Sequence, residues 1–444
     1  MDLFYFFFHK SLDLLKEGGI FGMITTNYFT TADSGIKLRN DLKKRANLLK
    51  LINLNELTVF ENAKGQHDLI STFKKKSVNS KKPVIDTIFV NRNESSNKKL
   101  FNEITSGKDN LSVYSKVKQD DIYDTDKNYI RIPKYDNFIM NNIFNKILED
   151  SDLLGDIKKV SQGIITGADK VTQRHLNNIK LKDIEKNEGV YVLSVDELNS
   201  LNLNKDEMQL IKPFFKNSDV YKYYTNEEPE KFLVYATRDL DINKYPNIKK
   251  HLYKYSKIIK ARSQDRGEIK AALKLGKWWV VFASRNDTNF EDEKIVAPQR
   301  SPTNTFGYNS VKWYGSADVY FITNNSNSDN ISLKYILSLL NSKLYYFWLV
   351  NKGKTKGDLL ELYYTPLTEI PIKIIGEKEQ EPFINLADNL IKLNKELKSC
   401  TVPNKCRLLE NRISVLNNEI NKLVYELYGL SDEEIEIIED IIGT

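Results

Sequence analysis

The chain has 444 residues, with 66 lysine and arginine residues against 60 aspartate and glutamate residues, so its formal net charge is +6. Hydrophobic residues make up 41% and no stretch approaches 18 uncharged apolar residues, which is typical of a globular protein of two or three domains and predicts no transmembrane helix. Two cysteines and four histidines are too few for a disulfide framework or a zinc pattern, and with no recognisable signal peptide they predict a cytoplasmic protein.

The N-terminal region is predicted to form part of an α/β sheet. Residues 2–17 place apolar side chains at helical spacing, and a glycine pair follows them. Residues 20–26 form a short apolar run, which predicts a strand buried on both faces. A basic amphipathic helix and three strands are predicted next, over residues 35–46, 48–54, 67–73 and 84–90.

A linker over residues 126–150 is predicted to separate this region from an α+β domain at 151–375. Within that domain we expect strands at 232–236, 278–282, 294–297 and 318–322, and helices within 246–262 and 331–348. Residues 376–444 place leucine and isoleucine at helical spacing on both sides of Pro403, which predicts a tail of two antiparallel helices. Cys400 and Cys406 flank this proline, and we expect them to be incidental thiols.

Several enzyme classes are excluded by the absence of their motifs. No two glycines stand two positions apart, so the chain has no G-x-G and lacks the dinucleotide-binding fingerprint. The P-loop pattern G-x-x-x-x-G-K-[ST] is missing too. H-E-x-x-H, G-x-S-x-G and any Pro-Pro dipeptide are also absent. Residues 291–294 (EDEK) contain the D/E-x-K pattern of nucleases, but no partner Pro-Asp precedes them, so we interpret the match as chance.

Short motifs in a fixed order carry a resemblance to a known family. They are DLFY at residues 2–5, LLKEGG at 14–19, ITTNYF at 24–29, SQGIITGADK at 161–170, IKPFF at 211–215 and VYELYGL at 424–430. This set resembles the TaqI-like DNA adenine-N6 methyltransferases of restriction–modification systems, in which a target-recognition domain follows the catalytic domain. Thr26 stands where the family has proline.

The resemblance implies a fold and a reaction. It implies that residues 1–125 are the C-terminal portion of a Rossmann-like catalytic sheet, that 151–375 are the target-recognition domain, and that 376–444 are a helical tail. Enzymes of this family transfer a methyl group from S-adenosylmethionine to adenine N6 in double-stranded DNA, and they extrude the base to reach it.

Candidate target-base residues lie in the N-terminal region. Asn27 and Tyr28 follow the strand at 20–26, at the edge of an α/β sheet where ligands commonly bind, although a turn role is the alternative. By resemblance, Phe60 corresponds to the aromatic residue that stacks on the flipped adenine; its alternative role is a core or loop-anchoring aromatic.

The resemblance also suggests DNA-binding residues in the second half of the chain. Small residues around Thr166 and Lys170 allow close approach to phosphates, and lysines alternate with small residues over 351–357. Arginines near Trp278 and Trp279 are candidate readers, since arginine matches guanine bidentately. The candidates are Thr166, Lys170, Arg262, Arg266, Arg285, Arg300, Lys352, Lys354 and Lys356. Solvated loops and surface ion pairs are the alternative interpretation.

Two parts of the family's catalytic machinery are missing from these 444 residues. Members bind the cofactor with a glycine-rich loop and hold the target amine with a [DN]-P-P-[YFW] tetrapeptide, and this sequence contains neither. We therefore predict no catalytic residue and no metal site in the chain, and catalysis only with a separate N-terminal half. The alternatives are a non-catalytic specificity subunit that docks on a catalytic partner, or an inactive decayed fragment.

Overall fold

The computed structural model describes residues 2–60, 66–77, 82–133, 137–179, 183–262, 267–285, 288, 290–325 and 330–443. Within these ranges, no helix is both long and apolar enough to cross a membrane. The chain divides into two compact units, Met1–Asn145 with Lys356–Asp358 and Lys146–Thr355 with Leu359–Thr444. The finer division into catalytic portion, linker, recognition domain and tail stays a prediction.

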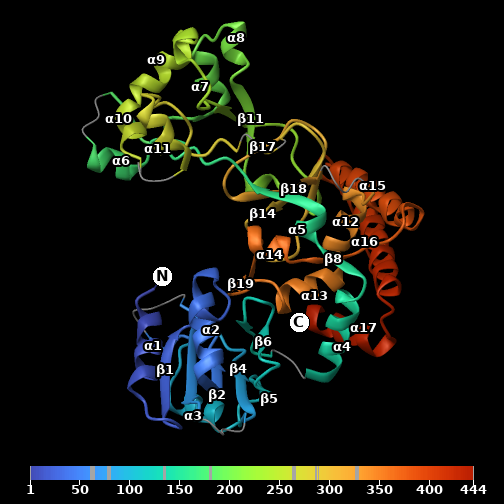
Figure 1. The fold of residues 1–444 in the computed structure, drawn as a ribbon. Coiled ribbons are helices and arrows are strands. Elements are labelled where there is room, and N and C mark those ends of the chain that lie inside the picture. Colours follow the sequence, from blue (N-terminus) through green and yellow to red (C-terminus); the bar gives the residue numbers. More distant parts are fainter. Residues whose placement is uncertain are drawn as a thin grey trace. The chain divides into compact units, whose positions relative to one another are not determined.

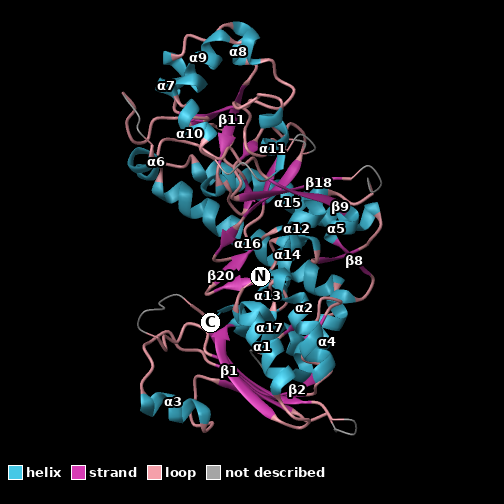
Figure 2. Ribbon diagram, turned by 60° about the vertical axis from the view of Figure 1, so that its left-hand side comes forward, coloured by secondary structure: helices cyan, strands magenta, loops and turns pink. Residues whose placement is uncertain are grey.

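The first unit is a twisted sheet covered by helices on both faces (Figure 1). Its elements are α1 (Phe4–Leu14), β1 (Ile20–Thr26), the 3-10 helices η1 (Asn27–Thr30) and η2 (Asp33–Gly35), α2 (Ile36–Arg45), β2 (Ala46–Asn53), β3 (Asp68–Lys75), β4 (Ile85–Phe89), α3 (Lys98–Thr105), β5 (Val113–Val117), β6 (Tyr123–Asp124) and β7 (Tyr129–Ile130). The main sheet has the order β1-β3-β2-β4-β5, and β3 runs antiparallel to both of its neighbours. Figure 2 shows α1 and α2 on one face and α3 on the other.

Helix α1 packs on one face of this sheet through aromatic side chains. Phe8 and Leu12 are buried, as the helical spacing predicts, and Tyr5 is buried with them. The expectation that Phe7 is a core residue is wrong, because it is exposed, as Leu3 and Leu14 are. The ring of Phe8 meets that of Phe73 on β3 edge-on, with the ring centroids 5.7 Å apart. Burying one such side chain contributes about 1.5–3 kcal/mol. The opposite face packs a second, smaller core in which Leu100 and Ile104 of α3 cover residues of β2 and β4.

Strand β1 is an edge strand. All seven of its residues pair with β3, from Ile20 opposite Lys74 to Thr26 opposite Asp68, and no described strand pairs with its other side. The prediction that this strand is buried on both faces is wrong, because alternate residues such as Ile20 and Ile24 are exposed. The exposed apolar side chains of α1, which lies over β1 through the Phe8–Phe21 contact, form what we call the α1/β1 surface: Leu3, Phe6, Phe7 and Leu14. Ile20 and Ile24 point to the opposite face of the sheet, where Ile24 pairs with Ile70.

The second unit contains two larger sheets. Its strands are β8 (Ser151–Leu153), β9 (Lys158–Gln162), β10 (Val192–Leu193), β11 (Ile211–Phe215), β12 (Tyr223–Tyr224), β13 (Lys231–Val234), β14 (Lys294–Pro298), β15 (Arg300–Ser301), β16 (Gly307–Asn309), β17 (Tyr314–Gly315), β18 (Val319–Asn324), β19 (Thr355–Lys356), β20 (Leu359–Glu361) and β21 (Pro371–Lys373). The larger sheets have the orders β10-β13-β11-β17 and β12-β16-β14-β18-β9. A continuous core, which includes the fully buried Trp313, lies against both of them.

The helices of this unit are distributed along its whole length. They are α4 (Asn137–Leu148), which leads into the unit, then α5 (Leu154–Ile157), α6 (Gln173–Asn178), α7 (Val195–Ser200), α8 (Lys205–Met208), η3 (Asn217–Asp219), η4 (Ile242–Lys244), α9 (Pro246–Lys254), α10 (Ser256–Lys260), α11 (Gly267–Lys274), α12 (Leu333–Leu340), α13 (Lys343–Asn351), α14 (Tyr364–Thr368), α15 (Glu377–Lys398), α16 (Pro403–Leu427) and α17 (Asp432–Gly443). The predicted strand at 278–282 is wrong. Its carbonyl groups accept hydrogen bonds from side chains instead, including Tyr191 Oη to Trp279 O at 2.7 Å and Arg262 Nη2 to Val280 O at 2.9 Å.

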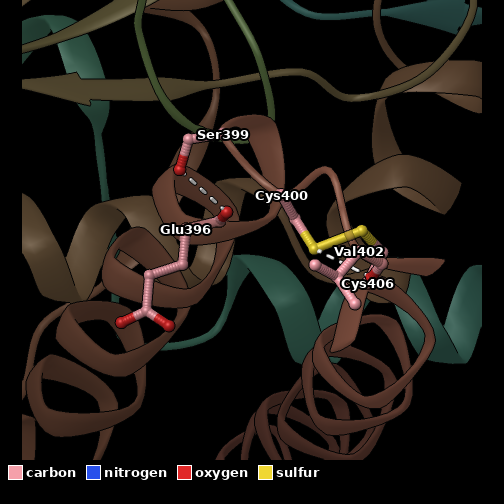
Figure 3. The surroundings of a disulfide bond; sticks show 5 residues. All are labelled: Glu396, Ser399, Cys400, Val402 and Cys406. Carbon is pink, nitrogen blue, oxygen red and sulfur yellow. Dashed lines mark hydrogen bonds between the residues drawn. A yellow bond between two sulfur atoms is a disulfide. The ribbon is translucent and has the colours of Figure 1, made fainter. Parts of the chain in front are cut away.

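The tail holds three helices rather than two, because α17 follows the predicted pair. Pro403 opens α16, where a missing N–H costs nothing. The expectation that the cysteines are incidental thiols is wrong, since Cys400 and Cys406 form a disulfide across the turn between α15 and α16 (Figure 3). The backbone of this turn brings the two residues together, and the N–H of Cys406 donates to Val402 O at 2.9 Å.

Candidate nucleic-acid interface

One segment of the second unit carries more positive charge than the chain as a whole. Residues 244–277 contain eleven lysine and arginine residues and two acidic residues, a net charge of +9 against +6 for all 444 residues. We call this segment the basic lobe. Its helices α9, α10 and α11 lie together at one end of the unit (Figure 1). A surface with this concentration of one sign attracts polyanions.

Aromatic rings lie among the lysines of the basic lobe. Tyr253 on α9 is 66% exposed, and its ring meets that of Trp278 edge-on at 6.2 Å. The ammonium group of Lys260 lies 5.3 Å from the Trp278 ring centroid, within the range of a cation–π contact. Exposed rings beside ammonium groups are the combination that nucleic-acid surfaces use for stacking and phosphate contact.

Only part of this charge is committed to contacts within the protein. Lys254 forms an ion pair with Glu188 at 2.5 Å, and Lys277 donates to the carbonyl of Arg238 at 2.6 Å. Lys250, Lys270 and Lys274 are exposed, and none of them has a side-chain partner in the part of the chain that the structure describes. These three ammonium groups are available to an external anion.

The motif at 161–170 forms a tight junction between strands. A Cβ atom on Gly163 would lie 2.0 Å from the carbonyl oxygen of Ser316, so only glycine fits there. Gly167 has a φ of +76°, which favours glycine as well. Thr166 is buried and its hydroxyl donates to Asp169 at 2.5 Å, whereas Lys170 is exposed. Lys170 is therefore the exposed charged residue of this motif.

Arg262 has a structural position in the second unit. Its guanidinium group donates to four backbone carbonyls, those of Ile259 at 2.8 Å, Thr166 at 2.6 Å, Val280 at 2.9 Å and Trp278 at 3.4 Å. Burial lowers its pKa from the ordinary value. These bonds occupy the donors that a base contact would need, so they favour the structural alternative for Arg262; its role in DNA contact stays a prediction.

The other candidate arginines differ in their surroundings. Arg285 adopts a left-handed conformation with a φ of +57°, and it donates to Gln162 at 2.9 Å. Arg300 contacts the buried carboxylate of Glu361 at 3.2 Å and donates to Tyr363 Oη at 2.8 Å. Arg266 lies outside the described residues. The two described side chains are thus positioned by neighbours, and their roles toward DNA stay predictions.

The lysine-rich segment at 351–357 includes the strand β19, which pairs with β20. Lys354 lies 3.3 Å from the carboxylate of Glu361, which also holds Arg300. One buried acid therefore anchors two of the predicted DNA-binding cations. Lys352 and Lys356 are only half-buried.

The first unit brings the predicted target-base residues to one edge of its sheet. Asn27 and Tyr28 begin η1, directly after the C-terminal end of β1, and the N–H of Asn27 donates to His67 O at 2.8 Å. Phe60 follows β2, which runs parallel to β1 because both are antiparallel to β3. Phe60 and Tyr28 are 47% and 39% exposed. Two rings at the C-terminal edge of the sheet are therefore accessible, as their predicted role requires.

The described residues bring together no recognisable donor set for a metal or for the family's cofactor. No group of three or more histidine, cysteine or acidic side chains that could hold a metal occurs in the described ranges. The chain has no G-x-G with which backbone amides could hold the cofactor, and the start of β3 offers only the buried carboxyl of Asp68, whose pKa burial raises. The residues of this chain therefore do not fit S-adenosylmethionine by themselves.

The basic lobe was missed as a site from the sequence. Attention to motifs selected single arginines and the 351–357 segment, while the lysines of α9 to α11 match no motif. A count of charge along the chain would have found the lobe, because residues 244–277 carry a net charge of +9 and the rest of the chain carries a net negative charge.

Two parts of the chain match models of known protein families. Residues 1–60 match the family model of the Eco57I restriction-modification methylase, and residues 212–372, which include the basic lobe, match that of the TaqI-like C-terminal specificity domain. The type II methyltransferase M.HindII of Haemophilus influenzae is 23% identical over 84% of this chain and 68% of its own length. The type II restriction enzyme and methyltransferase RM.Eco57I of Escherichia coli is 24% identical over 99% of this chain and 44% of its own length.

A solved structure shows a related fold. The type IIL restriction-modification enzyme MmeI, determined in complex with DNA, superposes with a TM-score of 0.61 at 13% identity, over all of this chain and 52% of that one. The chain thus spans from under half to about two thirds of the length of these proteins. The resemblance to restriction–modification methyltransferases with a TaqI-like specificity domain is confirmed.

Proposed function

We propose that this chain, a relative of type II restriction–modification methyltransferases with a TaqI-like specificity domain, is the DNA-recognition portion of an adenine-N6 methyltransferase. The observation that supports this most is the basic lobe, because it lies inside the region that matches the specificity domain. Such a concentration of lysines supplies the phosphate contacts on which binding to duplex DNA depends. Acting on the genome, the protein is expected in the cytoplasm.

Each unit has its own part in this proposal. The second unit binds the duplex through the basic lobe and through Lys170, and contacts to base edges supply sequence preference. The first unit receives the extruded adenine at the C-terminal edge of its sheet. There Phe60 offers a face for stacking and Tyr28 lines the site. These contacts position the base, and they bring about no chemical step themselves.

Methyl transfer requires groups that this chain does not contain. Adenine N6 is a poor nucleophile because its lone pair is delocalised into the ring, and the family holds N6 with its tetrapeptide while the cofactor supplies the methyl group. The α1/β1 surface supports a separate polypeptide portion as their source, because an open strand edge beside exposed aromatic side chains can continue a sheet.

The pure 444-residue protein is therefore expected to transfer no methyl group to DNA. The measurement is incorporation of tritium from labelled S-adenosylmethionine into a mixed-sequence duplex, with a complete adenine methyltransferase as positive control. Incorporation by the pure chain above the level of a protein-free reaction would contradict this proposal. A non-catalytic specificity subunit would also be inactive alone, but it would require a catalytic subunit that methylates only when this chain is present.

Replacing Lys352, Lys354 and Lys356 together with alanine is expected to weaken binding to all duplex sequences. If each ammonium group meets one phosphate, the slope of log K against log salt should fall by about 3. Fluorescence anisotropy with a labelled duplex at several salt concentrations measures both quantities. An unchanged affinity at low salt would remove this segment from the interface.

A further inference from the structure

A polar pocket of about 400 Å³ lies in the second unit, between the turn before β12 and the helices α13 and α16. It is distinct from every residue assigned to DNA or to the target base above. Its polar lining consists of two amines, three carboxamides, one hydroxyl and one acid: Lys222, Lys343, Asn417, Asn418, Asn421, Ser414 and Glu410. The amines, carboxamides and hydroxyl donate hydrogen bonds, and the two amines carry positive charge.

Lys222 lacks a counter-charge in this pocket. No acidic side chain in the described part of the chain forms an ion pair with it, and its ammonium group lies 5.9 Å from the centroid of the Tyr223 ring. Burial, with a smaller contribution from the charge of Lys343, lowers the pKa of Lys222 to about 8. An ammonium group in such surroundings is destabilised unless an anion approaches it.

The wall of the pocket is held in place by strained and hydrogen-bonded backbone. Tyr223 has a φ of +74°, a conformation that an aromatic residue adopts only when its surroundings impose it. Its hydroxyl donates to Asn417 at 2.9 Å, and its N–H donates to Phe306 O at 2.8 Å. These two bonds fix the turn that carries Lys222.

The remaining lining groups favour an anion as well. The side-chain oxygen of Asn421 accepts from the N–H of Lys343 at 2.9 Å, so the amide NH₂ of Asn421 remains a donor near the start of α13. Lys343 is paired with Glu439, whereas the acid on the pocket rim, Glu410, is exposed to solvent. Of the two lysines that line the pocket, Lys222 is therefore the one without a paired acid in the described part of the chain.

We propose that this pocket binds a phosphate group, held by the Lys222 ammonium and by the carboxamides of Asn418 and Asn421. Phosphate fits because it offers several acceptor oxygens to donors from the turn before β12 and from the helix α16. The proposal stands independently of the function proposed above, because it uses neither the basic lobe nor the first unit. Its first test uses no DNA.

The test is isothermal titration calorimetry of inorganic phosphate into the full chain at constant ionic strength. Lys222→Met keeps the apolar stem and removes the charge, and it is expected to weaken binding by tenfold or more. Asn418→Ala is expected to weaken it severalfold. Lys405→Met, which removes an exposed charge from the same helix α16 outside the pocket lining, is the matched control and should bind as the unaltered protein does.

Folding of each variant is checked by its urea midpoint. Lys222→Met is expected to match or exceed the midpoint of the unaltered chain, because it removes a charge that is costly to bury. Absence of phosphate binding by the unaltered chain, or equal binding by Lys222→Met, would overturn the proposal.

A second titration identifies the source of the phosphate. If a short duplex displaces inorganic phosphate and Lys222→Met weakens duplex binding, the group belongs to the DNA backbone. If duplex binding is unaffected while phosphate binding depends on Lys222, the pocket takes a free phosphate-bearing molecule. Both results support the site, and they assign it to different ligands.

Discussion

Replacing Lys250, Lys270 and Lys274 together with alanine is expected to lower the affinity of the chain for duplex DNA by about a thousandfold at 0.1 M salt. Each lysine that neutralises a phosphate releases a condensed counterion, which is worth about tenfold in affinity at that salt concentration. The three side chains are exposed, and none has a partner in the described structure. Their loss should therefore affect binding without affecting folding.

The salt dependence distinguishes this explanation from a general effect of charge. For the lobe variant, the slope of log K against log salt should fall by about 3. A control in which Lys378, Lys405 and Lys422 of the tail are replaced with alanine makes the same change in net charge outside the lobe. If the control loses as much affinity as the lobe variant, the basic lobe is not the contact surface.

We expect the isolated chain to self-associate through the α1/β1 surface, and replacing Phe6 and Phe7 with glutamate is expected to make it a monomer. Both side chains are 56% exposed on the α1/β1 surface, next to the open edge of β1. An apolar patch beside unpaired backbone groups promotes association between copies. Size-exclusion chromatography with light scattering measures the mass of each variant.

A matched control separates the surface of α1 from its core. Phe8 is completely buried, so Phe8→Ala should cost about 3–5 kcal/mol of unfolding free energy, while the surface pair should cost little.

Co-expression with an N-terminal half that carries G-x-G and N-P-P-Y should yield a soluble and active complex. A monomeric unaltered chain whose residues 1–90 resist protease would show that the first unit needs no further strand.

The spacing of apolar residues predicted the helices and strands of the first unit, but it did not predict the order of the strands in the sheet. Apolar spacing located α1, because Phe8 and Leu12 occupy one helical face, and it located β1 to β4 within a few residues. The insertion of β3 between β1 and β2 depends on pairing between distant segments, which spacing does not encode. The exposure of β1 follows from that order, since an edge strand has one neighbour.

In the candidate site, the sequence indicated which side chains have the right chemistry for DNA contact, but it did not indicate what those side chains contact in the fold. Thr166 and Arg262 have the chemistry of phosphate contacts, yet Arg262 donates to the carbonyl of Thr166 itself, 96 positions away in sequence. No motif reveals such a bond. The disulfide between Cys400 and Cys406 was missed for a related reason, because the turn at Pro403 brings together cysteines that composition alone assigns as thiols.

Selection of bound sequences from a random duplex library tests the central claim, which is that the chain recognises DNA. The full chain is incubated with the library at moderate salt and excess non-specific competitor, and the retained duplexes are sequenced. The account predicts enrichment of one recognition sequence that contains adenine, and loss of retention when Lys250, Lys270 and Lys274 are replaced. Retention without any enriched sequence, or no retention at all, would contradict it.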